Sequence, residues 1–292
     1  FRYMQVSTRQ NPHNPPGYLA DLLTGLTQAE IARLVEGEYG YIPEGPPVYP
    51  MFEHYRHVGM PSLREHTSLV RAWDFGFRHP AVTFHQFWRC KRGNIHWSLL
   101  DAMDGKMVEA VPFGERVFEY TQQAWPRLDS LMVEDVGDAA GAHVSDTGPG
   151  PILVFAQAPY NLNFAYKKCD VEPGLRMIRD FLRLPVCTCG DSSFLVHRKA
   201  RYVIEGLQGG YHLKRDVAGK AMKEDPLKDG FYDDFMDSVR YAAEHHLRPE
   251  LIDANLLATL DKTDPRRMYK GRDRDPWRAA VRKMMAYQER GT

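Results

Sequence analysis

The sequence predicts an α/β fold in which a mixed five-stranded sheet, an antiparallel meander followed by parallel strands, is flanked by helices. Three short apolar runs joined by tight turns lie between residues 66 and 100, which favours a meander. After residue 107, strand-like runs alternate with helical segments, which favours parallel crossovers. The apolar fraction of 43% over 292 residues is ordinary for a globular protein and allows a substantial core.

Residues 1–57 differ in pattern from the rest of the chain and are expected to form an appendage. A short helix is expected at about 18–24. The capping box at Thr27–Glu30 should open a second helix that ends near Gly37. Residues 41–50 are rich in Pro and Gly, so an extended linker into the main domain is expected there.

The meander consists of three expected strands, at 68–74, 81–88 and 94–100. Gly76–Pro80 supplies the first turn and Gly93 the second. Turns this short join neighbouring antiparallel strands, so the three strands should lie side by side.

Helical and strand-like segments then alternate along the chain. We expect helices at about 107–124, 148–158, 173–184 and 198–208, and strands at 131–136, 161–165, 193–196 and, as an edge strand, 211–214. The strand at 131–136 follows a helix, as in a parallel crossover.

The final helix is expected at about 230–246. Its apolar stripe has helical spacing and consists of Phe231, Phe235, Val239 and Ala242. Asp234, Asp237 and Tyr241 share a neighbouring face. The element order βββ-α-β-α-β-α is the layout of a ribonuclease H-like domain, with helices on both faces of the sheet.

The charge distribution bears on nucleic-acid binding. The net charge of zero excludes a global field that attracts DNA. Residues 262–292, however, carry ten Lys or Arg against four acidic residues, which leaves +6. A DNA contact and a merely solvated terminus are equally compatible with this tail. Candidate phosphate contacts in the core are Arg176, Arg179, Arg183, Arg198, Lys199 and Arg201.

The four cysteines are Cys90, Cys169, Cys187 and Cys189. With no signal peptide or long apolar run in the sequence, they indicate a reduced, cytosolic protein. The Cys187-Thr188-Cys189 spacing is poor for a zinc knuckle and no second pair follows. Even with His197 considered as a ligand, buried free thiols are the favoured interpretation. Because the chain opens on Phe1 like an interior strand, we expect a piece of a longer polypeptide.

Three acidic positions suggest a chemistry. Asp74 and Asp138 each end or interrupt an apolar, strand-like run, and Asp237 lies on the final predicted helix. Carboxylates brought to one edge of a sheet can hold hard divalent cations, which prefer oxygen ligands. Two such ions can cleave a phosphodiester. The leading hypothesis is therefore metal-dependent cutting of nucleic acid.

Each of these positions has a competitor. Asp135 lies on the same strand as Asp138, and a one-residue register change flips a side chain to the other face, so Asp135 is the weaker candidate. Asp138 is preferred for its Gly-Asp-x-Ala-Gly surroundings. Asp234 is one turn from Asp237 and is a candidate accessory ligand. Asp74 could instead cap a turn before a glycine. His143 and Lys228 could contact phosphate or water, or belong to the surface.

Three segments near the end of the predicted core resemble the closing part of the large terminase subunit of tailed bacteriophages. They are Gly-Tyr-His-Leu at 210–213, Pro-Leu-Lys-Asp-Gly at 226–230 and Tyr-Asp-Asp-Phe-Met-Asp-Ser-Val-Arg-Tyr at 232–241. The family has a Gly-Tyr strand, a Pro-x-Lys-Asp-Gly turn and a His/Asp-x-x-Asp-Ala-Leu-Arg-Tyr helix. The helix motif is the most specific of the three.

Other segments extend the resemblance over most of residues 1–250. Trp-Asp-Phe-Gly at 73–76 is similar to the family's first nuclease motif. Gly-Asp-Ala-Ala-Gly at 137–141 is similar to its Gly-Asp-Pro-Ala-Gly segment, with Ala139 where Pro is common. Leu-Val-Glu-Gly-Glu-Tyr-Gly at 34–40 resembles the end of the family's ATPase region.

The resemblance implies the nuclease half of a DNA-packaging motor. The sequence contains no Gly-x-x-x-x-Gly-Lys-Ser/Thr phosphate loop, so ATPase activity is not expected. Residues 1–57 would be the end of the ATPase region with a linker, 58–250 the ribonuclease H-like nuclease and 251–292 a basic tail. The domain would cut concatemeric double-stranded viral DNA in the host cytoplasm, outside the mature virion. Its partners would be DNA, the portal protein and the small terminase subunit.

The family's acidic positions imply a role for each aspartate. Asp74 would bridge two Mg²⁺ or Mn²⁺ ions, with Asp138 on one and Asp237 on the other. Two alternatives stay open: another ribonuclease H-like nuclease of resolvase or transposase type, or a non-catalytic module that docks on the portal or on DNA.

Overall fold

The structure is a computed structural model that describes residues 6–23, 35, 45–126, 132–144, 148–215 and 221–247. The capping box predicted at 27–30 and the basic segment 251–292 lie outside these residues. Near the N-terminus the structure has a short 3₁₀ turn, Thr8–Gln10, and the helix α1, Tyr18–Leu23, which confirms the helix expected at about 18–24.

The core of the molecule is a mixed sheet of seven strands in the order β1-β7-β4-β3-β2-β5-β6. The strands are β1 (Val58–Gly59), β2 (Leu69–Asp74), β3 (Ala81–Arg89), β4 (Ile95–Asp104), β5 (Val133–Asp138), β6 (Phe164–Lys167) and β7 (Phe194–His197). β3 is antiparallel to both neighbours, and all other pairs are parallel. The mixed ribonuclease H-like sheet is thus confirmed, with two more strands than expected.

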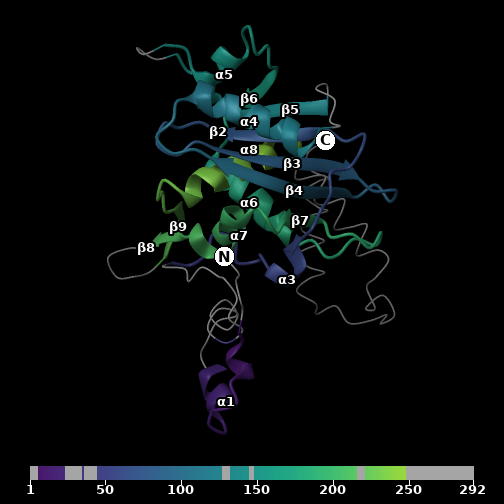
Figure 1. Cartoon of the computed structure of the whole chain (residues 1–292), viewed down its shortest axis with the longest axis vertical. Helices are drawn as coiled ribbons and strands as arrows, with labels where there is room; N and C mark the ends of the chain where they lie inside the picture. The colour runs from purple at the N-terminus through teal and green to yellow at the C-terminus, as the bar shows by residue number, and fades with distance from the viewer. Residues whose placement is uncertain are drawn as a thin grey trace, which may run out of the picture.

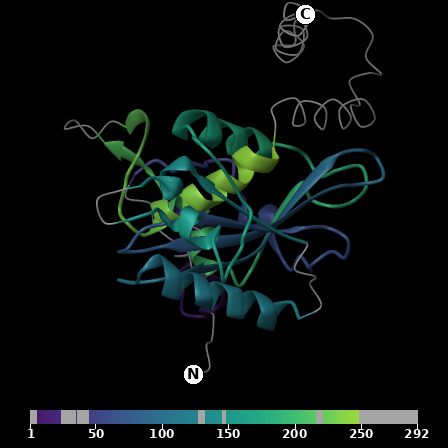
Figure 2. The ribbon, with the colours of Figure 1, turned by 90° about the horizontal axis from the view of Figure 1, so that it is seen from above.

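Helices cover both faces of this sheet (Figures 1 and 2). Figure 2 shows α8 lying across one face and α4 along the other. The helices are α3 (His54–His57), α4 (Ala110–Ala124), α5 (Pro151–Phe155), α6 (Val171–Leu182), α7 (Arg201–Glu205) and α8 (Tyr232–His246). α6 and α7 pack against α8, and α5 packs against α4. Among the described helices, none has the length and hydropathy that a membrane crossing requires.

The segment expected as an edge strand at 211–214 contributes an edge strand to a second, smaller sheet. β8 (Leu213–Arg215) pairs with β9 (Ala221–Pro226) in a separate two-stranded sheet instead of extending the main one. The sequence of β9 is Ala-Met-Lys-Glu-Asp-Pro, which has too little apolar alternation to predict a strand. The edge strand was therefore predictable from the sequence, but its partner strand was not.

Period-two alternation along β2 sorts its side chains between two cores. Leu69 and Trp73 pack with Phe113 of α4, whereas Val70 and Ala72 pack with Ala242 of α8. Asp74, two residues beyond Ala72, consequently belongs to the α8 face. Hydrophobic burial on both faces fixes the register of β2 and, with it, the side on which Asp74 emerges.

The segment 45–57, which includes the end of the expected linker, packs on the core. Val48 and Tyr49 are fully buried. The Val48 amide donates to the Tyr211 carbonyl at 3.1 Å, and Arg179 Nε of α6 donates to the Val48 carbonyl at 2.8 Å. These contacts tie the stretch before β1 to α6 and to the turn before β8.

Candidate active site

Asp74 and Asp138 lie next to each other at the carboxyl ends of the parallel strands β2 and β5. Trp73 of β2 is in register with Gly137 of the parallel strand β5, so the next position places the two aspartates on adjacent strands, about 4.8 Å apart along the ladder. Both belong to the α8 face, because Val136, two residues before Asp138, packs with Ala242. Strand register thus brings together two residues that are far apart in the sequence.

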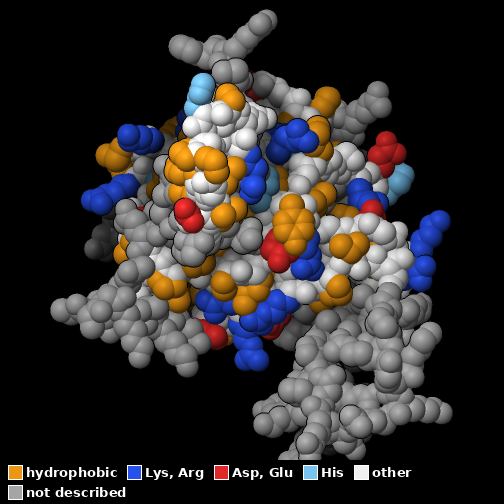
Figure 3. All heavy atoms as spheres, turned by 90° about the horizontal axis from the view of Figure 1, so that it is seen from below, with side chains coloured by type: hydrophobic (Ala, Val, Ile, Leu, Met, Phe, Trp, Pro, Cys, Tyr) orange, Lys and Arg blue, Asp and Glu red, His pale blue; other side chains and the backbone are white. Residues whose placement is uncertain are grey.

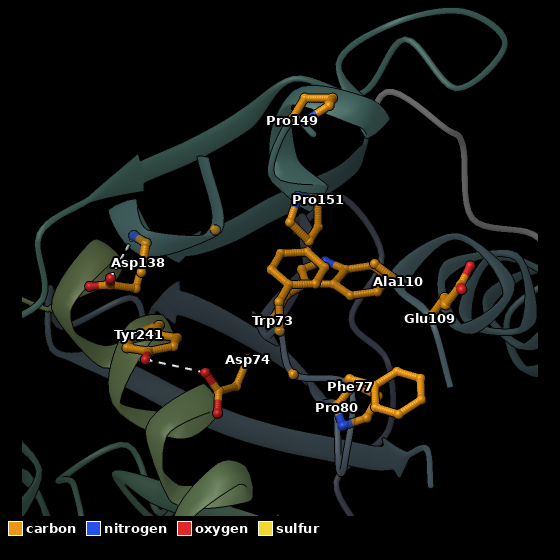
Figure 4. Close-up of a pocket in the computed structure, with 14 residues that line it drawn as sticks. Trp73, Asp74, Phe77, Pro80, Glu109, Ala110, Asp138, Pro149, Pro151 and Tyr241 are labelled. Atoms are coloured by element: carbon orange, nitrogen blue, oxygen red, sulfur yellow. Dashed lines mark hydrogen bonds between the residues drawn. The ribbon is translucent and has the colours of Figure 1, made fainter. Parts of the chain in front are cut away.

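A pocket of about 490 Å³ opens beside these carboxylates (Figure 4). Asp74, Asp138 and Tyr241 line it together with apolar side chains that include Phe75 and Pro151. The Tyr241 hydroxyl donates to Asp74 Oδ1 at 3.3 Å. In Figure 4 the Tyr241 ring lies between the two aspartates. The pocket therefore combines carboxylate oxygens with an apolar wall, and α8 supplies one side of it.

Backbone amides hold the Asp138 side chain. One carboxylate oxygen accepts from the Ala140 amide at 2.8 Å, at the start of the 3₁₀ turn Ala139–Ala142. The other accepts from the Cys169 amide at 2.8 Å. The Asp138 side chain reaches the Ala140 amide because the chain turns tightly at Gly-Asp-x-Ala. Small residues after Asp138 suit this tight turn.

Asp237 approaches the site from α8 but is held by cations. Arg240 Nη2 donates to its Oδ1 at 2.9 Å, and the Lys228 ammonium binds its Oδ2. Asp237 and Arg240 are both buried, whereas Lys228 is half-exposed. In the part of the chain that the structure describes, Asp74, Asp138 and Asp237 do not bring three ligand atoms within 4.8 Å of one another.

The electrostatics of Asp74 reflect its acidic neighbours. Burial, followed by the charges of Asp237 and Asp234, raises the pKa of the Asp74 carboxyl well above its usual range, while Lys228 and the hydrogen bond from Tyr241 oppose the shift. Burial also raises the pKa of Asp234. A neighbouring negative charge penalises a second ionised carboxylate, so these acids form one interacting group.

Two residues that the sequence did not suggest, His79 and Asp104, complete the group. His79 Nδ1 lies 3.1 Å from Asp234 Oδ2, and its Nε2 lies 3.0 Å from Asp104 Oδ2. Ala81 is in register with both Asp74 and Asp104, so Asp104 belongs to the same sheet edge. It was missed because the third strand was expected to end at residue 100. Extending the apolar run to Asp104 would have revealed it.

Asp135, the competitor of Asp138, faces the other way. Arg71 binds its carboxylate through two hydrogen bonds of 2.8 and 2.7 Å, and Trp73 Nε1 donates to it at 2.7 Å. All three residues are buried. Side chains an odd number of residues apart on a strand lie on opposite faces of the sheet. Asp135 is three residues before Asp138 and therefore lies on the α4 side. It binds Arg71 and Trp73 within the sheet and does not line the pocket.

The basic residues proposed for DNA contact have different surroundings. Lys228 binds Asp237, and His143 is exposed just after the Asp138 turn. Other candidates have partners: Arg179 with Val48, Lys199 with Asp101, Arg201 with Glu205, and Arg176 and Arg183 with Asp180. Arg198 is exposed. Figure 3 shows Lys and Arg side chains in several separate places on the described part of the lower face.

Comparison with known proteins places the fold. No protein-family model and no curated protein matches the sequence. Among solved structures, the large terminase of a thermophilic bacteriophage aligns with a TM-score of 0.50 at 12% identity, over 82% of this chain and 54% of that chain. The same terminase in complex with ADP gives a TM-score of 0.51 at 13% identity, over 80% and 52%. The chain thus spans about half the length of this terminase, and over that span it has the fold of a large terminase.

Proposed function

We propose that this chain is the nuclease part of a phage large terminase subunit, a divalent-metal-dependent endodeoxyribonuclease that cuts concatemeric double-stranded DNA during packaging. The main support is the placement of Asp74 and Asp138 side by side on the α8 face of one sheet edge, with Asp237 and Asp234 opposite. Residues 58–250 would form the nuclease domain, preceded by the end of an ATPase region and followed by a basic tail.

The donor set suits hard cations. Carboxylate oxygens from Asp74, Asp138 and Asp237, with Asp234 as an accessory ligand, would hold two Mg²⁺ or Mn²⁺ ions. Among the described interactions no basic side chain binds Asp74 directly, and the neighbouring charges that affect it most are those of Asp237 and Asp234. For Asp237 the exposed Lys228 ammonium is the replaceable partner, because the side chain of Lys228 is 52% exposed and that of Arg240 only 4%.

The protein's own groups would keep these ligands in place for the reaction. When bound, the cations would lower the pKa of a water molecule and stabilise charge on the phosphate and the leaving oxygen. Tyr241 orients Asp74, the backbone amides of Ala140 and Cys169 orient Asp138, and Arg240 orients Asp237. Lys228, released from Asp237, and the exposed His143 would be available to the DNA phosphates.

A plasmid-nicking assay in Mn²⁺ tests this function. The wild type should convert supercoiled plasmid to nicked and linear forms, and Asp74→Ala should reduce cutting to background. Asp180→Ala is the matched control, since Asp180 is a partly exposed aspartate of α6 that pairs with Arg176 and Arg183. Equal cutting by the wild type and Asp74→Ala would refute the site assignment.

One observation favours a second candidate function. The pairing of Asp237 with Arg240 and Lys228 neutralises one of the three acids, as a non-catalytic module that docks on the portal or on DNA would permit. Such a module would bind DNA and cut none in any divalent metal. A third candidate is a resolvase-type or other ribonuclease H-like nuclease. In a panel of substrates, such an enzyme would prefer branched DNA or an RNA–DNA hybrid over plain duplex DNA.

The same resemblance suggests where this activity would operate. The portal protein and the small terminase subunit would be its partners beside DNA, and the host cytoplasm its location. Pull-down of the chain with a purified portal ring would test the first of these partners.

A further inference from the structure

Four potential metal ligands lie close together at the opposite end of the strands from the acidic pocket. Cys90 follows β3 and His96 lies in β4, while Cys187 and Cys189 lie in the loop between α6 and β7. Their ligand atoms all lie within 4.8 Å of one another. We propose that these residues form a structural zinc site with three cysteine ligands and one histidine ligand.

The spacing of the ligand atoms suits a single tetrahedral ion. Cys90 Sγ lies 3.9 Å from Cys187 Sγ, and Cys189 Sγ lies 3.5 Å from His96 Nε2. Zinc bonds of about 2.3 Å to sulfur and about 2.0 Å to nitrogen place sulfurs about 3.8 Å apart, and sulfur and nitrogen about 3.5 Å apart, at tetrahedral angles. The sulfur separation is far longer than the roughly 2.05 Å of a disulfide, and all four cysteines are free.

Two turns of the same construction present these ligands. In each, the amide of a glycine donates to the carbonyl of the cysteine three residues before it, at 2.8 Å for both Gly93 to Cys90 and Gly190 to Cys187. The amide of each cysteine in turn donates to the carbonyl four residues further on. Both glycines have positive φ, 84° and 98°, which other residues rarely adopt. Two such turns facing each other form a cradle built from distant parts of the chain.

Hydrogen bonds around the cluster orient the ligands as metal sites require. His96 Nδ1 lies 2.9 Å from the Ser192 carbonyl oxygen, so Nδ1 carries the proton and Nε2 is free to bind a metal. Asn94 Nδ2 donates to Cys187 Sγ at 3.1 Å, and the Cys189 amide lies 3.5 Å from the same sulfur. Donors directed at sulfur stabilise a thiolate, the form that binds metal.

The ligand chemistry selects zinc over the cations proposed for the acidic pocket. Three thiolates and an imidazole are soft to borderline donors, which suit tetrahedral zinc and do not suit Mg²⁺. From the sequence spacing alone no zinc site was expected, because no second pair of ligands follows Cys187 and Cys189. The second pair, Cys90 and His96, lies earlier in the chain. His197, considered as a ligand from the sequence, is not part of the group.

The position of the site indicates its role. β4 and β7 pair over only three positions, Trp97–Leu99 with Phe194–Val196, and the zinc would clip the β3–β4 turn to the loop that leads into β7. β4 is ten residues long from Ile95 to Asp104, so the cluster lies about 30 Å from the acidic edge. The zinc would therefore stabilise this end of the sheet and take no direct part in DNA cutting.

Elemental analysis of the full chain provides the first test. Protein purified under reducing conditions from zinc-supplemented cells, without chelators, should contain one zinc ion per chain. Cys187→Ser should lose it, and Cys169→Ser, which alters the one cysteine outside the cluster, should keep it. Absence of zinc from the wild type, or an equal zinc content in Cys187→Ser, would overturn the proposal.

A second measurement on the wild type avoids any variant that fails to fold. Zinc removed by a strong chelator and replaced by Co²⁺ should give the intense visible absorption of tetrahedral cobalt with sulfur-to-metal charge transfer. Zinc should also protect three thiols from a thiol reagent, and chelation should lower the melting temperature. Octahedral, sulfur-free cobalt spectra with unchanged thiol reactivity would contradict the proposal. None of these readouts depends on nuclease activity.

Discussion

Two aspartates on β5, Asp135 and Asp138, have different surroundings because of their positions along the strand. Asp135 and Asp138 are three positions apart and so face opposite sides of the sheet. Asp135 accepts hydrogen bonds from Arg71 and Trp73 on the α4 side of the sheet. Asp138 lies at the end of the strand, beside Asp74 in the pocket. The preference for Asp138 rested on its Gly-Asp-x-Ala-Gly surroundings, and those small residues form the turn whose amide holds its carboxylate.

The two aspartates should respond differently to neutralisation. Asp135→Asn leaves the buried Arg71 guanidinium without its charge partner, which should cost about 3–5 kcal/mol of unfolding free energy. Asp138→Asn keeps one acceptor oxygen for only one of the two backbone amides and leaves the other amide without its acceptor, which should cost about 1–2 kcal/mol, while cutting in Mn²⁺ falls to background. Urea denaturation and plasmid nicking on both variants would check this. A reversal of the two effects would exchange the roles assigned here.

His57 makes stability depend on pH. Burial, reinforced by the nearby charge of Arg56, lowers the pKa of His57 to about 4, and its Nδ1 accepts a hydrogen bond from the Glu53 amide at 2.9 Å. The unfolded chain takes up this proton near its ordinary pKa of about 6.5. The stabilisation is thus complete above about pH 6.5 and is lost as the pH falls towards 4.

Removing this histidine should flatten the acid dependence of stability. Between pH 7 and pH 5 the wild type should lose roughly 1–2 kcal/mol through His57, and His57→Asn should lose less while keeping an acceptor for the Glu53 amide. His54→Asn, an exposed position in the same short helix, is the control and should follow the wild type. Urea denaturation at several pH values measures the difference, and identical slopes in all three proteins would disprove it.

At the scale of elements, the contact between α6 and α8 links packing to the site. A Cβ built at Gly174 of α6 would lie 2.6 Å from Arg240 Cγ and would also overlap Glu244. Arg240 binds Asp237 and Glu244, so Gly174 sets how closely α6 can approach the side chain that orients a proposed metal ligand. The need for glycine here arises from a neighbouring helix and not from the φ angle.

Gly174→Ala should therefore reduce both stability and cutting. Helix propensity gains about 1 kcal/mol, but overpacking typically costs about 1–3 kcal/mol, and the displaced Arg240 disturbs Asp237. Gly114→Ala in α4 is the matched control, because its Cβ would lie 2.7 Å from Phe155 Cε1 on the opposite face of the sheet. It should lower stability while leaving the cutting rate of the folded protein unchanged. Equal loss of cutting in both variants would argue against the link through Arg240.

Elements with a strong pattern were the predictable ones. β2, β3, β4 and α8 combine length with clear apolar periodicity, and their positions agree with expectation to within a few residues. β1, at two residues, and the polar β9 offer too short or too weak a pattern. The helix expected at 198–208 is divided into α7 and a π-helical turn, Gly206–Gly210, where Gly209 has φ 130°, because three glycines weaken a regular helix there.

For the whole molecule, topology determines what the sequence could reveal. The acidic site follows from the meander and one crossover, which place the ends of β2 and β5 together, so Asp74 and Asp138 were predictable as neighbours. The cysteine–histidine cluster depends on the insertion of β7 between β1 and β4. No local spacing encodes that pairing, and the same applies to the contact of His79 with Asp234, which depends on the packing of α8 on the sheet.

The charge balance of the whole chain leads to a last prediction. A molecule of net charge zero binds DNA through local clusters, and most basic candidates of the folded core are paired with acids or carbonyls. We therefore predict that the tail 262–292, with +6, is the main source of salt-dependent affinity for DNA. Replacing Arg266, Arg267, Lys270 and Arg272 with Gln should weaken DNA binding at low salt and reduce the slope of log K against log salt by up to about four.

The tail variant should keep the melting temperature of the wild type, because the substitutions remove charge and change no apolar side chain. Fluorescence anisotropy with a labelled duplex over a salt series measures the slope, and Arg176→Gln with Arg183→Gln on the exposed face of α6 provides the control. If the tail variant keeps the wild-type slope and the α6 variant loses it, the phosphate contacts lie on the folded domain. In that case the ion pairs of α6 must open on binding, and the affinity should fall with salt more gradually than the count of arginines suggests, since each contact first breaks an internal pair.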